Sequence, residues 1–185
     1  MLEDIVFLDD ATRPEVPRLE GVTPAQRLAG EHLVEIHDHL RQNMQVLKQL
    51  LRRASAGAVT PAEIEAQAAD LAMLANYRRF GNLCGQYCQF VEMHHSIEDQ
   101  AIFPKLARQS EGFRRIAERL KAEHVVVHEL LERLIVALST LAREPTAENF
   151  ATCRTVYETL ERVLLSHLGY EEDSIGDALG YFDII

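Results

Sequence analysis

Apolar residues recur along most of this chain at intervals of three and four positions, the spacing typical of amphipathic α-helices. A first helix is predicted to begin at Thr23-Pro24, where a threonine N-cap precedes proline at the first helical position, and to run to about Ser55. Gly57 ends it. Its apolar stripe consists of Leu28, Leu33, Ile36, Leu40, Met44, Leu47 and Leu51.

Three further helices are predicted on the same grounds. The second begins at Thr60-Pro61 and continues to Pro104, which should bend or stop it because proline has no backbone N–H and clashes with the preceding turn. The third covers Gly112–Arg143, and the fourth begins near Pro145-Thr146. No segment shows the alternating pattern of a strand.

Long helices joined by short linkers favour antiparallel neighbours. The sequence therefore predicts an all-α protein in which residues 23–185 form an antiparallel up-down-up-down four-helix bundle. Residues 1–22 contain Pro14, Pro17 and Gly21 and show no sustained period, so we expect an extended N-terminal arm on the surface of the bundle.

Composition narrows the class of protein. The chain has 185 residues, which fits one domain, and its 47% apolar and 26% charged residues are typical of a globular protein. The first ten residues are acidic, unlike a secretory signal, and no apolar run approaches the roughly 18 residues of a membrane span. We therefore expect a cytoplasmic protein without a membrane partner. The formal net charge of -10 also argues against nucleic acid as a partner.

The three cysteines are too few, and odd in number, for a disulfide framework. Cys84 and Cys88 lie one helical turn apart, and together with Cys153 they are predicted to be small buried thiols. A redox or zinc role for the first two is the alternative, but the sequence places no further ligands near them.

Seven ionisable side chains interrupt the apolar stripes of the four predicted helices. They are His37; His94 and Glu98; His124 and His128; and His167 and Glu171. The members of each pair are four positions apart and project together from a helix. Burying so many polar groups without partners would cost several kcal/mol for each charged group. Bound metal ions are the natural partners, since imidazole and carboxylate suit iron, manganese or zinc.

The chain also repeats a pattern. His94 to Asp99 and His167 to Glu172 share the order His-x-x-x-Glu-acid, and two helix pairs related by an approximate two-fold axis would bring them to opposite sides of one site. Because a carboxylate can bridge two ions, this favours a dinuclear centre. Even with both carboxylates and one solvent oxygen bridging the ions, the seven protein ligands leave one position of two six-coordinate ions for a small ligand.

These motifs resemble the hemerythrin family, specifically the hemerythrin-like HHE cation-binding proteins of bacteria, over about residues 28–180. The matching residues are His37-Asp38-x-Leu40-Arg41, His94-His95-x-x-Glu98-Asp99, Glu123-His124-x-x-x-His128-Glu129 and His167-Leu168-x-x-Glu171-Glu172.

The resemblance implies two iron ions bridged by an oxo or hydroxo group, with His124, His128 and His167 on one iron and His37 and His94 on the other. Glu98 and a carboxylate of the fourth helix would bridge them, and the iron with two histidines would bind dioxygen or another small ligand. The oxygen carriers of the family have an aspartate where this chain has Glu172. We prefer Glu171 because it shares the apolar stripe of His167, although a local bulge could select Glu172.

Other polar residues near the motifs receive weaker predictions. His95 is rotated about 100° from His94 and is expected to make a supporting or inter-helix contact rather than to bind metal. His32 and His39 are expected to be exposed. Tyr87 lies two turns before His94 and is predicted to be a core residue, with a hydrogen bond to a metal-bound oxygen species or a place as an extra metal ligand as the alternatives.

Asp38 and Arg41 could orient metal ligands, although a solvated position is the better prediction for Asp38. A ferritin-like di-iron site is disfavoured, because it needs two Glu-x-x-His motifs and the chain offers only Glu92-x-x-His95.

The leading functional hypothesis is a non-haem di-iron protein that binds or senses dioxygen, nitric oxide or peroxide. One alternative is an enzyme that consumes peroxide or nitric oxide at the same metals, although no Gly-rich nucleotide fingerprint supplies an electron donor. The other is an iron-responsive regulatory or storage protein. The acidic surface and Leu-rich helices permit self-association without predicting an oligomeric state.

Overall fold

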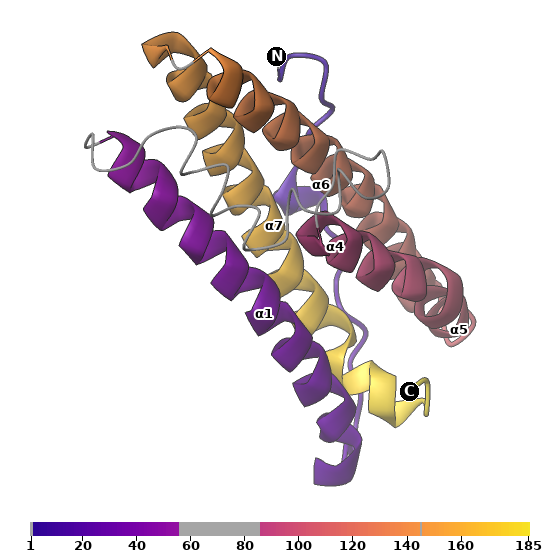
Figure 1. Cartoon of the computed structure of the whole chain (residues 1–185). Helices are drawn as coiled ribbons and strands as arrows, with labels where there is room; N and C mark the ends of the chain where they lie inside the picture. The colour runs from indigo at the N-terminus through magenta and orange to yellow at the C-terminus, as the bar shows by residue number, and fades with distance from the viewer. Residues whose placement is uncertain (1, 56–85, 145) are drawn as a thin grey trace.

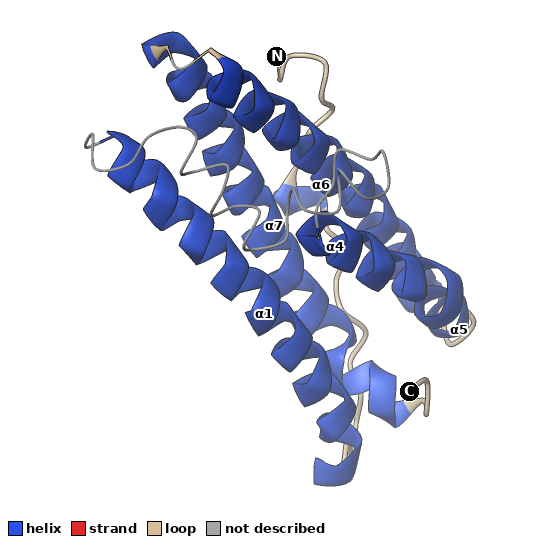
Figure 2. Cartoon of the chain, viewed as in Figure 1, coloured by secondary structure: helices blue, strands red, loops and turns tan. Residues whose placement is uncertain are grey.

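The computed structural model describes residues 2–55, 86–144 and 146–185 (Figure 1). Within these ranges the chain is helical, with loops between the helices and no strand (Figure 2). The predicted helix start at Thr60-Pro61 and the cysteine Cys84 lie outside the described residues, as do the side chains of Tyr87 and Cys88. Among the described helices, none is both long enough and apolar enough to cross a membrane.

Three long helices dominate the structure and confirm three of the predicted ones. They are α1 (Pro24–Ser55), α6 (Glu111–Arg143) and α7 (Ala147–Tyr181). Helix α7 lies between α1 and α6, and it runs in the opposite direction to both (Figure 1). The centre of the molecule is therefore built around α7.

Side-chain caps explain where these helices begin. The Thr23 hydroxyl accepts a hydrogen bond from the backbone N–H of Gln26, whose own side-chain oxygen accepts one from the N–H of Thr23. Ser110 caps α6, and Thr146 caps α7 by accepting from the N–H three residues on. These are short-range signals, which is why the sequence predicts the helix starts well.

Two apolar clusters fill the interior at different heights along the helices. The upper cluster includes Leu40, Met44, Val127, Leu134, Leu160 and Leu164. The lower cluster includes Leu33, Phe103, Ile116, Leu120, Ile175 and Leu179. His37, His124 and His167 each lie on their helix between residues of the two clusters, so a polar layer separates them. One predicted core residue, Leu28, is instead 61% exposed near the start of α1.

The helical segment that begins with α4 does not end at Pro104. Helix α4 (Gln86–Ile97) passes into a π-helical turn, η2 (Glu98–Ile102), and then into α5 (Phe103–Ala107). The backbone N–H of Phe103 donates to the carbonyl of Glu98, five residues earlier. A proline ring in an α-helix clashes with the carbonyl four residues before it, and the wider turn relieves that clash. The predicted interruption thus takes the form of a change in helical register that begins at Glu98.

Helices α1 and α7 pack closely against each other at Gly30 and Gly176. A Cβ atom added to Gly30 would lie 2.8 Å from the carbonyl oxygen of Gly176, which is rigid backbone. We expect Gly30→Ala to lower the free energy of unfolding by about 1 to 3 kcal/mol, because the helices must move apart. Gly169→Ala is the control, since nothing lies within 4 Å of its added methyl group, and it should stabilise the helix by up to about 1 kcal/mol. Urea unfolding that ranks the two variants equally would contradict this packing.

The N-terminal segment, residues 2–22, lies across α6 and α7 and includes one short 3-10 turn, η1 (Asp10–Thr12). Its direction is opposite to that of α6, because Asp4 pairs with Arg133 near the end of α6 whereas Pro17 lies against Gly112 near its start. The segment also contributes Leu2, Ile5 and Leu8 to the edge of the upper cluster.

Candidate metal centre

Two groups of potential metal ligands meet in the polar layer between the apolar clusters. The His37 group consists of His37, His94, Glu98 and Glu171, and the three-histidine group consists of His95, His124 and His167. Within each group the potential ligand atoms lie within 4.8 Å of one another, and all seven side chains are buried. They come from α1, α4, η2, α6 and α7, so every described helix except α5 and the short η1 contributes.

The two glutamates connect the groups. Glu98 has one carboxylate oxygen 3.2 Å from Nε2 of His94 and the other 3.6 Å from Nε2 of His124. One oxygen of Glu171 lies 3.6 Å from Nε2 of His37 and 3.5 Å from Nε2 of His167. Each carboxylate therefore faces one histidine of either group, which is the placement that a bridging ligand of two metal ions requires.

Carboxylates on the outer side hold three of the imidazoles in one orientation. Each accepts a hydrogen bond from the Nδ1–H of a histidine, which leaves the Nε2 lone pair directed at the centre. The pairs are His37 with Glu172 at 2.8 Å, His124 with Asp99 at 3.2 Å, and His167 with Glu123 at 3.1 Å. Glu172 thus supports a histidine, while its neighbour Glu171 faces the centre.

His95 and His128 exchange the places that the sequence predicts. His95 is buried and stacks on His124 with ring centroids 3.7 Å apart, whereas half-buried His128 lies behind it, its Nε2 2.9 Å from Nδ1 of His95. The structure therefore leaves His128 out of both groups. The sequence does contain a signal for the inward position of His95. It is the apolar residue Val91, which lies four positions earlier on the same side of α4 and is fully buried in the structure. The inner face of α4 is wide enough to bury two adjacent histidines.

The other polar neighbours fall largely where the sequence predicts. His32 and His39 are exposed. Asp38 is exposed as well, while Arg41 pairs with Glu172 at 2.7 Å. Sequence reasoning missed the roles of Glu123 and Asp99, although both belong to the quoted motifs, because nothing local indicates which side chain they contact.

A test of fit comes from atoms that lack partners. Among the described residues, the buried atoms without a hydrogen bond are Nε2 of His95, His124 and His167 and both carboxylate oxygens of Glu98 and Glu171. Each such atom costs about 1 to 3 kcal/mol if nothing binds it. All belong to the two groups, and imidazole nitrogen with carboxylate oxygen is a donor set suited to iron, manganese and zinc. The residues therefore fit metal cations.

Burial sets the protonation of the centre. It lowers the pKa of His37 to about 2 and that of His94 and His124 to about 4, with neighbouring histidines adding to the effect for each. Burial raises the pKa of Glu98 to about 11, assisted by the adjacent charge of Glu171, whose own pKa burial also raises. His37, His94 and His124 are thus neutral and able to bind a cation, whereas bound cations would have to displace a proton from Glu98.

This arrangement predicts how metal binding depends on pH. Loading two Mn²⁺ ions should release at least the proton of Glu98, and this contribution should stay constant between pH 5 and 8. Histidines with ordinary pKa values would add protons as the pH falls through 6.5, but the lowered pKa values of His37, His94 and His124 prevent this contribution from those three. Calorimetric titrations in buffers of different ionisation enthalpy measure the number. A release that grows steeply below pH 6.5 would contradict the assignment.

In the part of the chain that the structure describes, buried imidazoles and two shared carboxylates between long helices define a helical, cation-binding protein. The family model described as "Hemerythrin HHE cation binding domain" matches residues 28–179, and the chain therefore belongs to the hemerythrin HHE family. The match includes both groups and leaves the whole N-terminal segment outside it. Comparisons with curated proteins and with solved structures gave no match.

Proposed function

We propose that this protein binds two iron ions and that the pair binds or senses a small oxidant or gas, either dioxygen, nitric oxide or peroxide. The observation that carries the proposal is the position of Glu98 and Glu171, each of which faces histidines of both groups. His95, His124 and His167 would hold one iron, and His37 and His94 the other.

The same proposal includes the arrangement of the helices. Residues 23–185 form one antiparallel up-down-up-down four-helix bundle, in which α4, η2 and α5 are the end of the second helix and residues 1–22 are an arm on its surface. Support comes from the packing of α7 against α1 and α6 and from the contacts of α4 with α1 and α6. Such a bundle surrounds the two groups with helices on all sides.

Bound iron would supply an electron-rich centre that small oxidants and nitric oxide bind. The chain supplies the ligands, the room for a small molecule and the apolar surroundings. Five imidazoles against two carboxylates favour reversible binding over oxidative chemistry, and the two-histidine side has fewer protein donors, which leaves room for a ligand. Apolar residues limit the access of water, among them Phe103, whose ring stacks on that of His124 at 5.6 Å.

Anaerobic reduction of the iron-loaded protein, followed by exposure to dioxygen, nitric oxide or peroxide, tests the proposal. The expected result is a change in the visible absorption bands that reverses when the ligand is removed. Zinc-loaded protein is the control, because zinc has no redox chemistry and should give no such bands. An iron-loaded protein that responds to none of the three ligands would refute the proposed function.

A further inference from the structure

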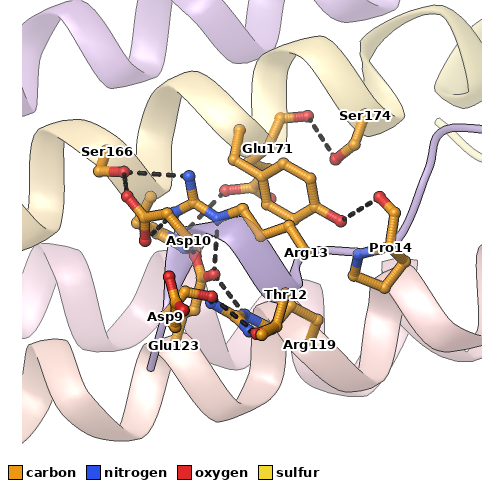
Figure 3. Close-up of polar contacts among 12 residues, drawn as sticks. Asp9, Asp10, Thr12, Arg13, Pro14, Arg119, Glu123, Ser166, Glu171 and Ser174 are labelled. Carbon is orange, nitrogen blue, oxygen red and sulfur yellow. Dashed lines mark hydrogen bonds and ion pairs between the residues drawn. The ribbon is translucent and has the colours of Figure 1, made fainter. Parts of the chain in front are cut away.

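Arg13 connects the N-terminal segment to the metal centre. Its Nε and Nη2 donate to the two carboxylate oxygens of Glu123 at 2.9 and 3.1 Å (Figure 3). Glu123 is only 4% exposed, and it accepts the hydrogen bond from Nδ1 of His167. A residue outside the family match thus lies two contacts away from a member of the three-histidine group.

The position of Arg13 is fixed from several sides. Nη1 donates to the hydroxyl of Ser166 at 3.0 Å, and the guanidinium lies 4.6 Å from the centre of the Tyr170 ring. Ser166 in turn donates to Asp10 of the same segment at 2.6 Å. Figure 3 shows the hydrogen bonds that join Arg13, Ser166 and Asp10 between the N-terminal segment and the helices. The segment is therefore held by specific polar contacts close to the metal centre.

Arg119 of α6 ties the segment and Glu123 together. Its Nε donates to Glu123 at 2.7 Å, while its other nitrogens donate to the hydroxyl of Thr12 and the carbonyl of Asp9 at 2.7 and 2.9 Å. Two guanidinium groups thus neutralise one buried carboxylate, but only that of Arg13 grips both of its oxygens. A bidentate grip fixes the plane of a carboxylate, which a single contact does not.

The His37 group has a counterpart built entirely within the helices. Glu172 accepts from Nδ1 of His37 and pairs with Arg41 of α1 at 2.7 Å. The order of arginine, carboxylate and imidazole is the same as in Arg13, Glu123 and His167. The difference is that the arginine on the three-histidine side comes from the N-terminal segment.

We propose that Arg13 is a positioning residue for the metal ion of the three-histidine group, so that the N-terminal segment completes one half of the centre. The inference rests on the proposed metal binding. Arg13 holds the plane of Glu123, Glu123 holds the ring of His167, and the ring directs Nε2 at the metal. Loss of such a supporting contact typically weakens metal binding about 10-fold to 100-fold.

Zinc titration followed by imidazole NMR tests this with Zn²⁺ alone as the probe. In Arg13→Gln, the signals of His167 and His124 should respond only at about 10-fold to 100-fold higher free Zn²⁺, while those of His37 respond as in the wild type. Arg41→Gln should show the reverse pattern. Arg114→Gln is the matched control, since Arg114 is an exposed arginine of α6 that pairs with Glu111 and Glu118.

Arg13→Lys provides a second measurement that keeps the charge and loses the bidentate grip, and it should give an intermediate weakening. Equal responses of both groups in Arg13→Gln, whether both unchanged or both weakened, would overturn the role of Arg13. A wild-type protein whose histidine signals ignore Zn²⁺ would instead refute the metal centre itself, which is a different outcome.

Discussion

Glu98→Gln protein is expected to lose the metal pair, keeping at most one ion for each chain, with affinity lowered by at least about 100-fold. Glu98 is the side chain whose two oxygens face His94 and His124 in different groups. An amide has one oxygen and no charge, so it neither spans two cations nor neutralises them. Equilibrium dialysis against a competing chelator measures the loss, and Glu158→Gln, at an exposed position of α7, is the matched control.

Although Glu98→Gln should weaken metal binding, it should make the metal-free protein more stable to unfolding at high pH. Burial raises the pKa of Glu98 to about 11, so the stability that its proton provides is complete below about pH 4.5 and declines as the pH rises toward 11. The decline is about 1.4 kcal/mol for each pH unit. Between pH 7 and 9 the lowered pKa values keep His37 and His94 neutral, so they add no slope.

Urea unfolding of metal-free protein at pH 7 and 9 measures this slope. The wild type should lose stability between the two pH values, and Glu98→Gln should lose less and be the more stable protein at pH 9. A variant that is less stable than the wild type under these conditions would show that Glu98 has a structural role of another kind.

The second large effect concerns metal affinity and distinguishes His95 from His128, since the sequence favours His128 as a metal ligand and the structure favours His95. His95→Ala should lower metal affinity at the three-histidine group by at least about 100-fold, because it removes a potential ligand. His128→Ala should weaken binding there by about 10-fold, because His128 contacts only the outer nitrogen of His95. His32→Ala, at an exposed position, is the control.

Stepwise binding constants for Zn²⁺ in the three variants decide between the assignments. A larger loss in His128→Ala than in His95→Ala would support the ligand set implied by the family resemblance and would contradict the grouping in the structure. The two substitutions remove the same kind of side chain from neighbouring places, because His95 and His128 are hydrogen-bonded to each other, so a difference in affinity reports which histidine binds the metal.

The sequence predicts those features that short-range signals determine. The starts of α1 and α7 follow from the threonines that the sequence places before them, and the inward position of Glu171 follows from the apolar stripe of an uninterrupted helix. In the structure His37, His94 and Glu98 lie in one group with Glu171. His124 and His167 also lie at the centre, as their spacing on apolar stripes suggests.

Features that depend on how helices rotate and pack could not be predicted. The position of His95 depends on the orientation of α4, which its contacts with α1 and α6 set, and the π-helical turn before Pro104 depends on how the chain accommodates a proline. The contact between Arg13 and Glu123 joins residues 110 positions apart, and no local pattern indicates it.

Iron analysis with Mössbauer spectroscopy of protein loaded with iron and then oxidised is the most direct test of the central claim. Two irons for each chain are expected, with spins coupled through shared ligands, so that the oxidised pair is diamagnetic at low temperature. One iron or fewer after supplementation with iron, or two ferric ions with the magnetic spectra of isolated centres, would contradict it.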